Sequence, residues 1–237
     1  MTTPVTDTEF AALQARFAER ARACCTLPER ERALCELAAL IAQDESDAFA
    51  ARLEESLNGA LTPDEASELV VFSAAFWGLA RAKRFFAAQS EVFAARGLHP
   101  APPANETADR AEAGLRVLLS LFGEGMADPA ETGPEDTRAL GRLMRDEFFG
   151  EFYARPALSL ADRELAAFCF LIALGSPAQM SAHIIASYNA GLDRAKLIAA
   201  VAAALPHVGW PRAIDALTAL NATDAQLNND GYDDDPF

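Results

Sequence analysis

"SLADRELAAFCFLIALGSPAQMSAHI", residues 159–184, is the stretch of sequence that decides the fold. Ser159 followed three residues later by Asp162 is typical of a helix N-terminus, and the apolar run Leu165–Leu174 comes soon after it. This run is too short to cross a bilayer, which requires about 20 residues. It therefore predicts a helix that is buried in a protein core.

The same stretch contains a carboxylate near its start, Glu164, and an imidazole near its end, His183. A carboxylate and an imidazole that meet in a folded protein can form an acid–base pair. They can equally be polar residues of two separate helices, since an acid near a helix N-terminus is favoured by the helix dipole. The stretch alone leaves both interpretations open.

The composition favours an all-α protein. The chain has 237 residues, of which 51% are hydrophobic and 23% charged, which is an ordinary globular balance. Alanine-rich segments dominate, and the β-branched alternation of strands is scarce. The net charge of −15 argues against a nucleic-acid partner, which requires clustered lysine and arginine. The small basic cluster Arg81, Lys83 and Arg84 is typical of a solvated helix face.

The polar, acidic N-terminal residues lack the pattern of a signal peptide, and no apolar run is long enough to span a membrane. The four cysteines, Cys24, Cys25, Cys35 and Cys169, include no CxxC pair. This pattern fits neither a disulfide framework nor a zinc site, and no metal is expected. We expect a cytoplasmic protein in a reducing compartment, with no membrane partner.

Helix start signals recur along the chain. Capping boxes are predicted at Thr26–Glu29, Thr62–Glu65, Ser159–Asp162 and Ser176–Gln179, and Asp193 is expected to open a helix over 194–205. Pro211 begins or kinks the next helix.

Prolines and polar residues divide the chain. Pro100, Pro102 and Pro103 indicate a linker over 99–107, and a second break is expected over 127–137. One amphipathic helix is predicted between them, over 108–126. The resulting division is a first, degenerate repeat at 1–98, a linker with one helix at 99–137, a second repeat with the candidate site at 138–222, and an acidic, disordered tail at 223–237.

The two repeats follow from laying residues 26–84 over residues 159–215. With an offset of 133, Arg30-Glu31 aligns with Arg163-Glu164; after small gaps the offset becomes 131, and Gly78 meets Gly209. Arg81 then meets Arg212. This pattern predicts a duplicated helical unit, in which each half buries its apolar face against the other.

The repeats differ in their chemistry. Glu31 matches Glu164, but His183 falls opposite Arg52, and His207 falls opposite Phe76. Only the second repeat keeps a carboxylate and imidazoles together.

"GEFYARPALSLADRELAAFCFLIALGSPAQMSAHI…GL…GWPRAIDAL", residues 150–217, resembles the carboxymuconolactone decarboxylase family. The shared features are an aromatic residue before Arg155-Pro156, then Arg163-Glu164, Ala-Leu-Gly at 173–175, His183, and Gly209 with Pro211 and Ala213. The first repeat resembles the same unit more weakly. The resemblance implies an all-α fold and a homo-oligomer, a trimer or a pseudo-hexameric assembly.

The resemblance also implies one of two chemistries. The alkylhydroperoxidase-like branch uses a glutamate, a CxxC pair and a histidine. Here Ser176 and Gln179 stand twelve and fifteen positions after Glu164, where the cysteines are expected, while His183 matches. A serine has no thiolate chemistry, and Cys169 is expected to be a small buried hydrophobe. This branch is disfavoured.

The other branch decarboxylates γ-carboxymuconolactone without a cofactor. By this resemblance Glu164 and His183 are the candidate acid and base, and Arg155 and Ser176 the candidate substrate-binding residues. His207 stands where decarboxylases of the family tend to carry a tyrosine, and we expect it to reach the same pocket as a third catalytic residue. The substrate is then a small, anionic, lactone-like molecule. Glu31, which has no histidine partner, is expected to be structural.

Two alternatives remain open. A redox protein of the alkylhydroperoxidase type predicts a reactive cysteine with a low pKa. A catalytically silent oligomerisation or binding module predicts that Glu164 and His183 lie in separate, closed environments.

Overall fold

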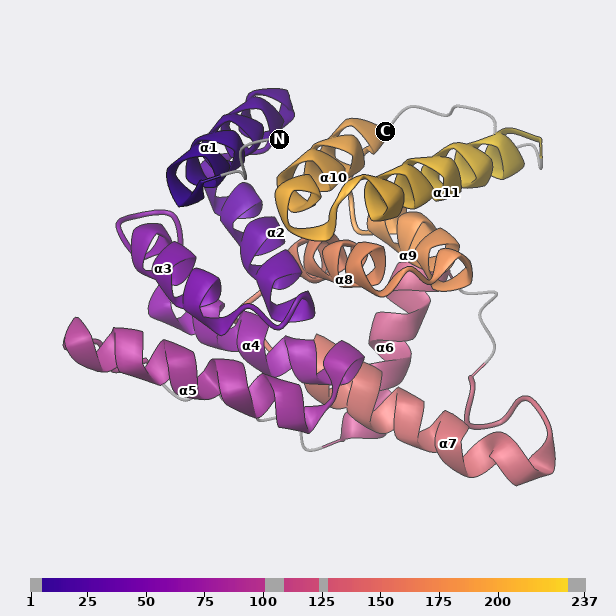
Figure 1. Cartoon of the computed structure of the whole chain (residues 1–237). Coiled ribbons are helices and arrows are strands. Elements are labelled where there is room, and N and C mark those ends of the chain that lie inside the picture. The colour runs from indigo at the N-terminus through magenta and orange to yellow at the C-terminus, as the bar shows by residue number, and fades with distance from the viewer. Residues whose placement is uncertain (1–5, 101–108, 124–127, 230–237) are drawn as a thin grey trace.

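The computed structural model describes residues 6–100, 109–123 and 128–229, and these form eleven α-helices, one 3₁₀-helix and one π-helix, with no strand among them (Figure 1). The all-α prediction is confirmed. The α-helices are α1 (Asp7–Cys24), α2 (Glu29–Ala42), α3 (Ser46–Ser56), α4 (Pro63–Trp77), α5 (Leu79–Ala95), α6 (Arg110–Phe122), α7 (Arg138–Leu143), α8 (Leu160–Leu174), α9 (Pro177–Asn189), α10 (Arg194–Val208) and α11 (Trp210–Asn229). The 3₁₀-helix η1 is Glu135–Thr137, and the π-helix η2 is Met144–Tyr153. No helix within the described residues has the length and apolar character that a membrane crossing requires.

Helices α2 and α8 form the centre of the core. Figure 1 shows them between α4 and α5 on one side and α10 and α11 on the other. Every residue from Asp162 to Ala173 of α8 is buried, as the apolar run predicts. A helix that is apolar on all faces is stable only where other helices cover each face, so the run 165–174 places α8 in the interior.

The segments α2–α5 and α8–α11 share their helix order and two local features. Gly78 between α4 and α5 has φ 80° and ψ 159°, and Gly209 between α10 and α11 has φ 78° and ψ 167°. The Arg81 guanidinium donates to the Ala42 carbonyl at 2.6 Å, and the Arg212 guanidinium donates to the Leu174 carbonyl at 3.0 Å. In both segments an arginine therefore caps the C-terminus of the first helix.

Two of the four predicted capping boxes are wrong. The boxes at Thr62 and Ser159 are confirmed, with both reciprocal hydrogen bonds present. Helix α2 instead begins at Glu29 with Pro28 at its N-cap, so Thr26 lies too far out to cap it. Ser176 does occupy the N-cap of α9 but makes no capping hydrogen bond, because its ψ of 85°, against 165° at Ser159, turns the hydroxyl away from the first turn.

The difference between these two serines predicts a difference in stability. Replacing Ser159 with alanine removes the capping bond to the Asp162 amide, so we expect the free energy of unfolding to fall by about 1 kcal/mol. Ser176→Ala, the matched control, removes no such bond and is expected to change it by less than about 0.5 kcal/mol. Chemical denaturation of both variants measures the difference, and equal losses would contradict the capping geometry.

The helix ends also differ from the sequence prediction. Helix α6 ends at Phe122 because Gly123 takes a positive φ of 84°, and residues 124–126 of the predicted helix lie outside the described residues. The tail was expected to be disordered from residue 223, which is wrong for residues 223–229. Thr223 is buried in α11, and Asp224 accepts a 2.6 Å hydrogen bond from Tyr188. Residues 230–237 and most of the predicted linker, 101–108, also lie outside the described residues.

Two glycines allow α6 and η2 to cross closely. A Cβ atom at Gly114 would lie 2.0 Å from the Arg145 carbonyl oxygen, and one at Gly150 would lie 2.1 Å from the Arg110 carbonyl oxygen. Such backbone contact is available only to glycine. It fixes η2 on the body of the fold, and Tyr153, the last residue of η2, is thereby held against α8. π-Helical segments of this kind are frequent beside functional sites.

Candidate functional site

Glu164 and His183 meet in the interior. Glu164 lies near the start of α8 and is 0% exposed, and His183 lies on α9 and is 6% exposed. The Glu164 Oε2 atom is 2.8 Å from His183 Nδ1. Helices α8 and α9 are joined by a sharp turn at Gly175, whose φ is 67°, so the two helices pack side by side and the residues face each other. The structure thus brings together Glu164 and His183, for which the sequence left open whether they form a pair or lie apart on two helices.

Tyr153 completes this group, and sequence reasoning missed it. Its hydroxyl donates a 2.8 Å hydrogen bond to Glu164 Oε1. Burial and the Glu164 charge raise the pKa of Tyr153 well above its ordinary value, so the phenol stays protonated and acts as a donor. The available signal was the aromatic residue before Arg155-Pro156, which the family resemblance contains without a stated role.

The two hydrogen bonds match those of a carboxylate that accepts on both oxygens, one of them from Tyr153. In the tautomer that carries its proton on Nδ1, His183 donates to the other oxygen, and Nε2 keeps its lone pair. Among the described residues, Nε2 has no hydrogen-bond partner. The group Tyr153–Glu164–His183 therefore presents one basic nitrogen, oriented by a carboxylate.

Aromatic rings surround this group. The Phe76 ring of α4 lies 5.8 Å from the His183 ring, and it also contacts Phe170 at 5.3 Å and Phe148 at 5.4 Å. Apolar surroundings strengthen charge interactions because little water screens them. An imidazolium formed at His183 would therefore be stabilised strongly by the Glu164 carboxylate.

Arg155 pairs with two glutamates, Glu68 and Glu151. Its Nε atom donates to both Glu68 oxygens, at 3.0 and 2.9 Å, and its Nη1 atom donates to Glu151 at 2.9 Å. Glu68 also pairs at 3.0 Å with Arg163, and Glu68 and Arg163 are both fully buried. Arg155 and Tyr153 share the lining of a cavity of about 400 Å³ beside α6. Arg155 thus lies at the edge of the group rather than within it.

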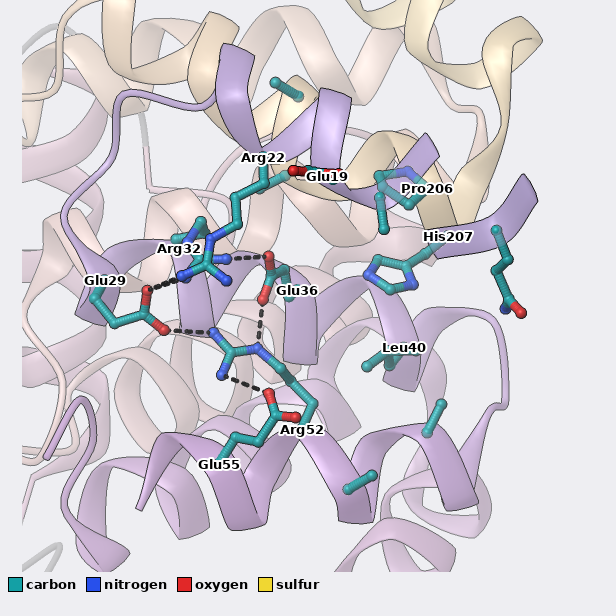
Figure 2. Close-up of a pocket in the computed structure, with 16 residues that line it drawn as sticks. Glu19, Arg22, Glu29, Arg32, Glu36, Leu40, Arg52, Glu55, Pro206 and His207 are labelled. Carbon is teal, nitrogen blue, oxygen red and sulfur yellow. Dashed lines mark hydrogen bonds and ion pairs between the residues drawn. The ribbon is translucent and has the colours of Figure 1, made fainter. Parts of the chain in front are cut away.

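Ser176 and His207 lie apart from Glu164 and His183. Ser176 is half-buried at the N-cap of α9 and contacts neither of them. His207 lines a different cavity, of about 680 Å³, between α1, α2, α3 and α10. Figure 2 shows His207 across this cavity from Glu36 and Arg52, which belong to a network with Arg32 and Glu29. The expectation that His207 reaches the pocket of His183 is wrong.

The sequence register explains where His207 lies. In the sequence alignment His207 falls opposite Phe76, which contacts the His183 ring, and His183 falls opposite Arg52, which lies across the cavity from His207 (Figure 2). Burial lowers the pKa of His207; nearby Glu36 opposes this shift, and Arg52 adds to it. The imidazole is therefore neutral at pH 7.

This shift predicts a pH dependence of stability. Because the pKa in the folded state lies below the unfolded value of about 6.5, the unfolded chain takes up the proton first, and stability is lost as the pH falls below about 6.5. We expect His207→Phe to reduce this loss, since phenylalanine does not titrate. Denaturation at a series of pH values measures it, and an unchanged pH dependence in the variant would contradict the burial of the imidazole.

Among the described residues, no three His, Cys, Asp or Glu side chains are grouped as a metal site requires. Burial raises the pKa values of Cys25 and Cys35, and Cys169 is also buried. These thiols do not match the exposed, low-pKa cysteine of a thiol peroxidase.

Comparison with known proteins gives one family match. Residues 138–222 match the sequence model of the carboxymuconolactone decarboxylase family. No curated protein matches the chain. The matched region contains Tyr153, Glu164 and His183. Phe76 of α4, which contacts the His183 ring, and Glu68 of α4, which pairs with Arg155 and Arg163, lie outside it.

Proposed function

We propose that the carboxymuconolactone decarboxylase family domain at residues 138–222 is a cofactor-independent acid–base centre, a carboxy-lyase for a small anionic lactone or a related carboxylate. The observation that carries this proposal is the buried Glu164 carboxylate, which joins Tyr153 on one side to His183 on the other at 2.8 Å each. This is the arrangement in which a carboxylate orients a histidine and stabilises its protonated form.

The reaction needs one proton. His183 Nε2 takes a proton from solvent, and Glu164 stabilises the resulting imidazolium. When the carbon–carbon bond to the substrate carboxylate breaks, CO₂ leaves and the electron pair moves into the conjugated lactone carbonyl. The proton on Nε2 is then transferred to the electron-rich carbon. The conjugated carbonyl serves as the electron sink, so no cofactor is part of this proposal.

Arg155 is the proposed anchor for the substrate anion. It borders the 400 Å³ cavity together with Tyr153, and its partner Glu151 is partly exposed, whereas its partner Glu68 is fully buried. A substrate carboxylate can replace Glu151 as the partner of Nη1 while Glu68 keeps the guanidinium in place. Ser176, like Glu164 and His183, lines none of the four cavities of about 680, 600, 400 and 490 Å³, and its role in substrate binding stays a prediction of the sequence.

The duplicated unit is part of the same proposal. The matching backbone of Gly78 and Gly209, and the matching contacts of Arg81 and Arg212, support a tandem repeat. In the first unit Glu31, the counterpart of Glu164, binds Lys196 at 2.7 Å and has no imidazole beside it. The second unit would therefore carry the chemistry, and the first would be its scaffold.

A homo-oligomer, a trimer or a pseudo-hexameric assembly, is also proposed. Four large apolar side chains on α1 and α11 are more than half exposed: Phe10, Leu13, Trp210 and Ile214. Two of them, Leu13 and Trp210, line a groove of about 600 Å³. Apolar surface of this kind is typical of contacts between subunits, and the mass in solution by light scattering tests it.

A silent binding module has less support than an enzyme. That alternative predicted separate environments for Glu164 and His183, whereas they are hydrogen-bonded. The redox alternative predicted a cysteine with a low pKa, whereas burial raises the pKa values of Cys25 and Cys35.

The test is release of CO₂ from γ-carboxymuconolactone generated in situ, with the purified full chain. We expect release by the natural protein and none above background with His183→Ala. Absence of release by the natural protein would remove this substrate. Equal release by both would remove His183 from the chemistry.

A further inference from the structure

A cavity of about 490 Å³ lies along α4 and α5, away from Glu164 and His183. Two polar side chains line it, Ser67 of α4 and Gln89 of α5, and they are only 6% and 1% exposed. Among the described residues seven buried side-chain atoms lack a hydrogen-bond partner, and two of them, Ser67 Oγ and Gln89 Oε1, belong to residues that line this cavity. Buried polar atoms without partners are costly and rare. Two of them on the walls of one cavity indicate a ligand that pairs with both.

Ser67 lacks the hydrogen bond that several hydroxyl side chains of the described α-helices make. Six of them donate to a carbonyl three or four residues earlier: Ser56, Ser73, Ser90, Ser181, Thr218 and Thr223. This local bond is the usual way in which a helical serine satisfies its hydroxyl. Ser67 and Ser187 make no such bond, and each hydroxyl oxygen is buried without a partner among the described residues.

The amide oxygen of Gln89 is buried without a hydrogen-bond partner among the described residues. An amide oxygen accepts up to two hydrogen bonds, and here it accepts none from the described residues. An unpaired amide in this buried position lowers the stability of the ligand-free protein, so stability does not favour a glutamine here.

The remaining walls define the chemistry of the ligand. They are largely apolar, with two aromatic rings: Val71, Phe86, Phe93 and Leu98. Arg155 is the one permanently charged residue that lines the cavity, and it is paired with Glu68 and Glu151. An anionic ligand would have to compete with these carboxylates, whereas a neutral ring would lie against the apolar walls.

We propose that this cavity binds a small, neutral aromatic molecule that carries a hydroxyl group, that is, a phenol. One phenolic hydroxyl can serve both orphan groups, because it donates one hydrogen bond, to Gln89 Oε1, and accepts another, from Ser67 Oγ. The ring then lies among Phe86, Phe93 and the aliphatic residues. This cavity shares the Arg155 side chain with the cavity of the proposed decarboxylase site, but Ser67 and Gln89 line only this one.

The probe is 4-fluorophenol, followed by ¹⁹F NMR during titration with the full chain. 4-Fluorotoluene, which lacks the hydroxyl, and 4-fluorobenzoate, which is charged, are the matched ligands. We expect saturable binding of the phenol, affinity about tenfold weaker for the toluene, and weaker binding still for the benzoate. Equal binding of phenol and toluene, or no saturable binding of the phenol, would overturn the proposal.

Three variants locate the site. Ser67→Ala and Gln89→Met are each expected to weaken binding of 4-fluorophenol by about tenfold. Ser90→Ala is the matched control: Ser90 lines the same cavity, but its hydroxyl is already paired with the Phe86 carbonyl. We expect its affinity to be unchanged. Unchanged binding in Ser67→Ala and Gln89→Met would place the phenol elsewhere, for example in the groove beside Trp210, and would overturn the proposal.

Thermal unfolding distinguishes a binding role from a structural one. Gln89→Met replaces a buried, unpaired amide with an apolar side chain of similar shape, so we expect the melting temperature of the ligand-free protein to rise. A lower melting temperature would show that Gln89 supports the fold, through a buried water or another partner, and would contradict the ligand role. The melting temperature also shows that each variant is folded.

Discussion

Replacing Glu68 with glutamine is expected to lower the free energy of unfolding by about 3–5 kcal/mol. Glu68 is fully buried and holds two arginines, Arg163 at 3.0 Å and Arg155 at 2.9 Å. Glutamine keeps the shape of the side chain but removes the charge. Arg163 would then be a buried cation without a counter-charge, and burial already lowers its pKa. Denaturation with urea measures the loss.

The control for this prediction is an exposed ion pair. Glu112 binds Arg116 at 2.6 Å on the surface of α6, so Glu112→Gln is expected to change the free energy of unfolding by less than about 0.5 kcal/mol. A second control adds Arg163→Met to Glu68→Gln, which removes both buried charges and is expected to restore much of the stability. If Glu68→Gln cost no more than Glu112→Gln, the buried ion-pair network would not support the fold.

Replacing Glu164 with glutamine is expected to lower the rate of CO₂ release by about 10²–10⁴-fold, the usual contribution of general acid–base catalysis. The amide can still accept a hydrogen bond from Tyr153, but it cannot stabilise an imidazolium at His183 as a carboxylate does. The rate at saturating substrate should fall more than the KM rises, because the interaction strengthens only when His183 is protonated.

Glu31→Gln is the matched control, since Glu31 aligns with Glu164 in the sequence and pairs with Lys196. We expect its rate of CO₂ release to stay within about twofold of that of the natural protein. The ion pair that it removes, with Lys196, is partly exposed, and such pairs contribute little to stability. Equal losses in both variants would mean that the effect comes from the fold and not from the Glu164–His183 pair. An active Glu164→Gln variant would remove the carboxylate from the mechanism.

Much of the fold could be predicted from local patterns. The apolar run 165–174 predicted the buried helix α8, and the boxes at Thr62 and Ser159 predicted where α4 and α8 begin. These features depend on residues within one helical turn of each other. The errors arose where a local pattern competes with its surroundings. The acidic residues after 222 favour disorder, yet packing of Thr223 and pairing of Asp224 with Tyr188 extend α11 to Asn229.

The candidate site could be predicted only in part. The spacing of Glu164 and His183 is a local signal, because it spans two consecutive helices. Other partners are distant in sequence. Phe76 of α4 contacts His183, and Glu68 of α4 pairs with Arg163, the residue before Glu164, from about ninety residues away. No local pattern indicates such pairs. For His207 the alignment of the two halves already argued against a catalytic role, because it placed His207 opposite Phe76 and not opposite a residue of the acid–base pair.

The most direct test of the account is the tautomer of His183, measured by two-bond ¹H–¹⁵N NMR correlation in the neutral imidazole. The account requires the proton on Nδ1, donated to Glu164, and an unprotonated Nε2. We therefore predict one protonated nitrogen, Nδ1, whose signal shifts in Glu164→Gln. A proton on Nε2, with Nδ1 unprotonated, would mean that Glu164 does not orient a basic nitrogen, and it would contradict the proposed acid–base centre.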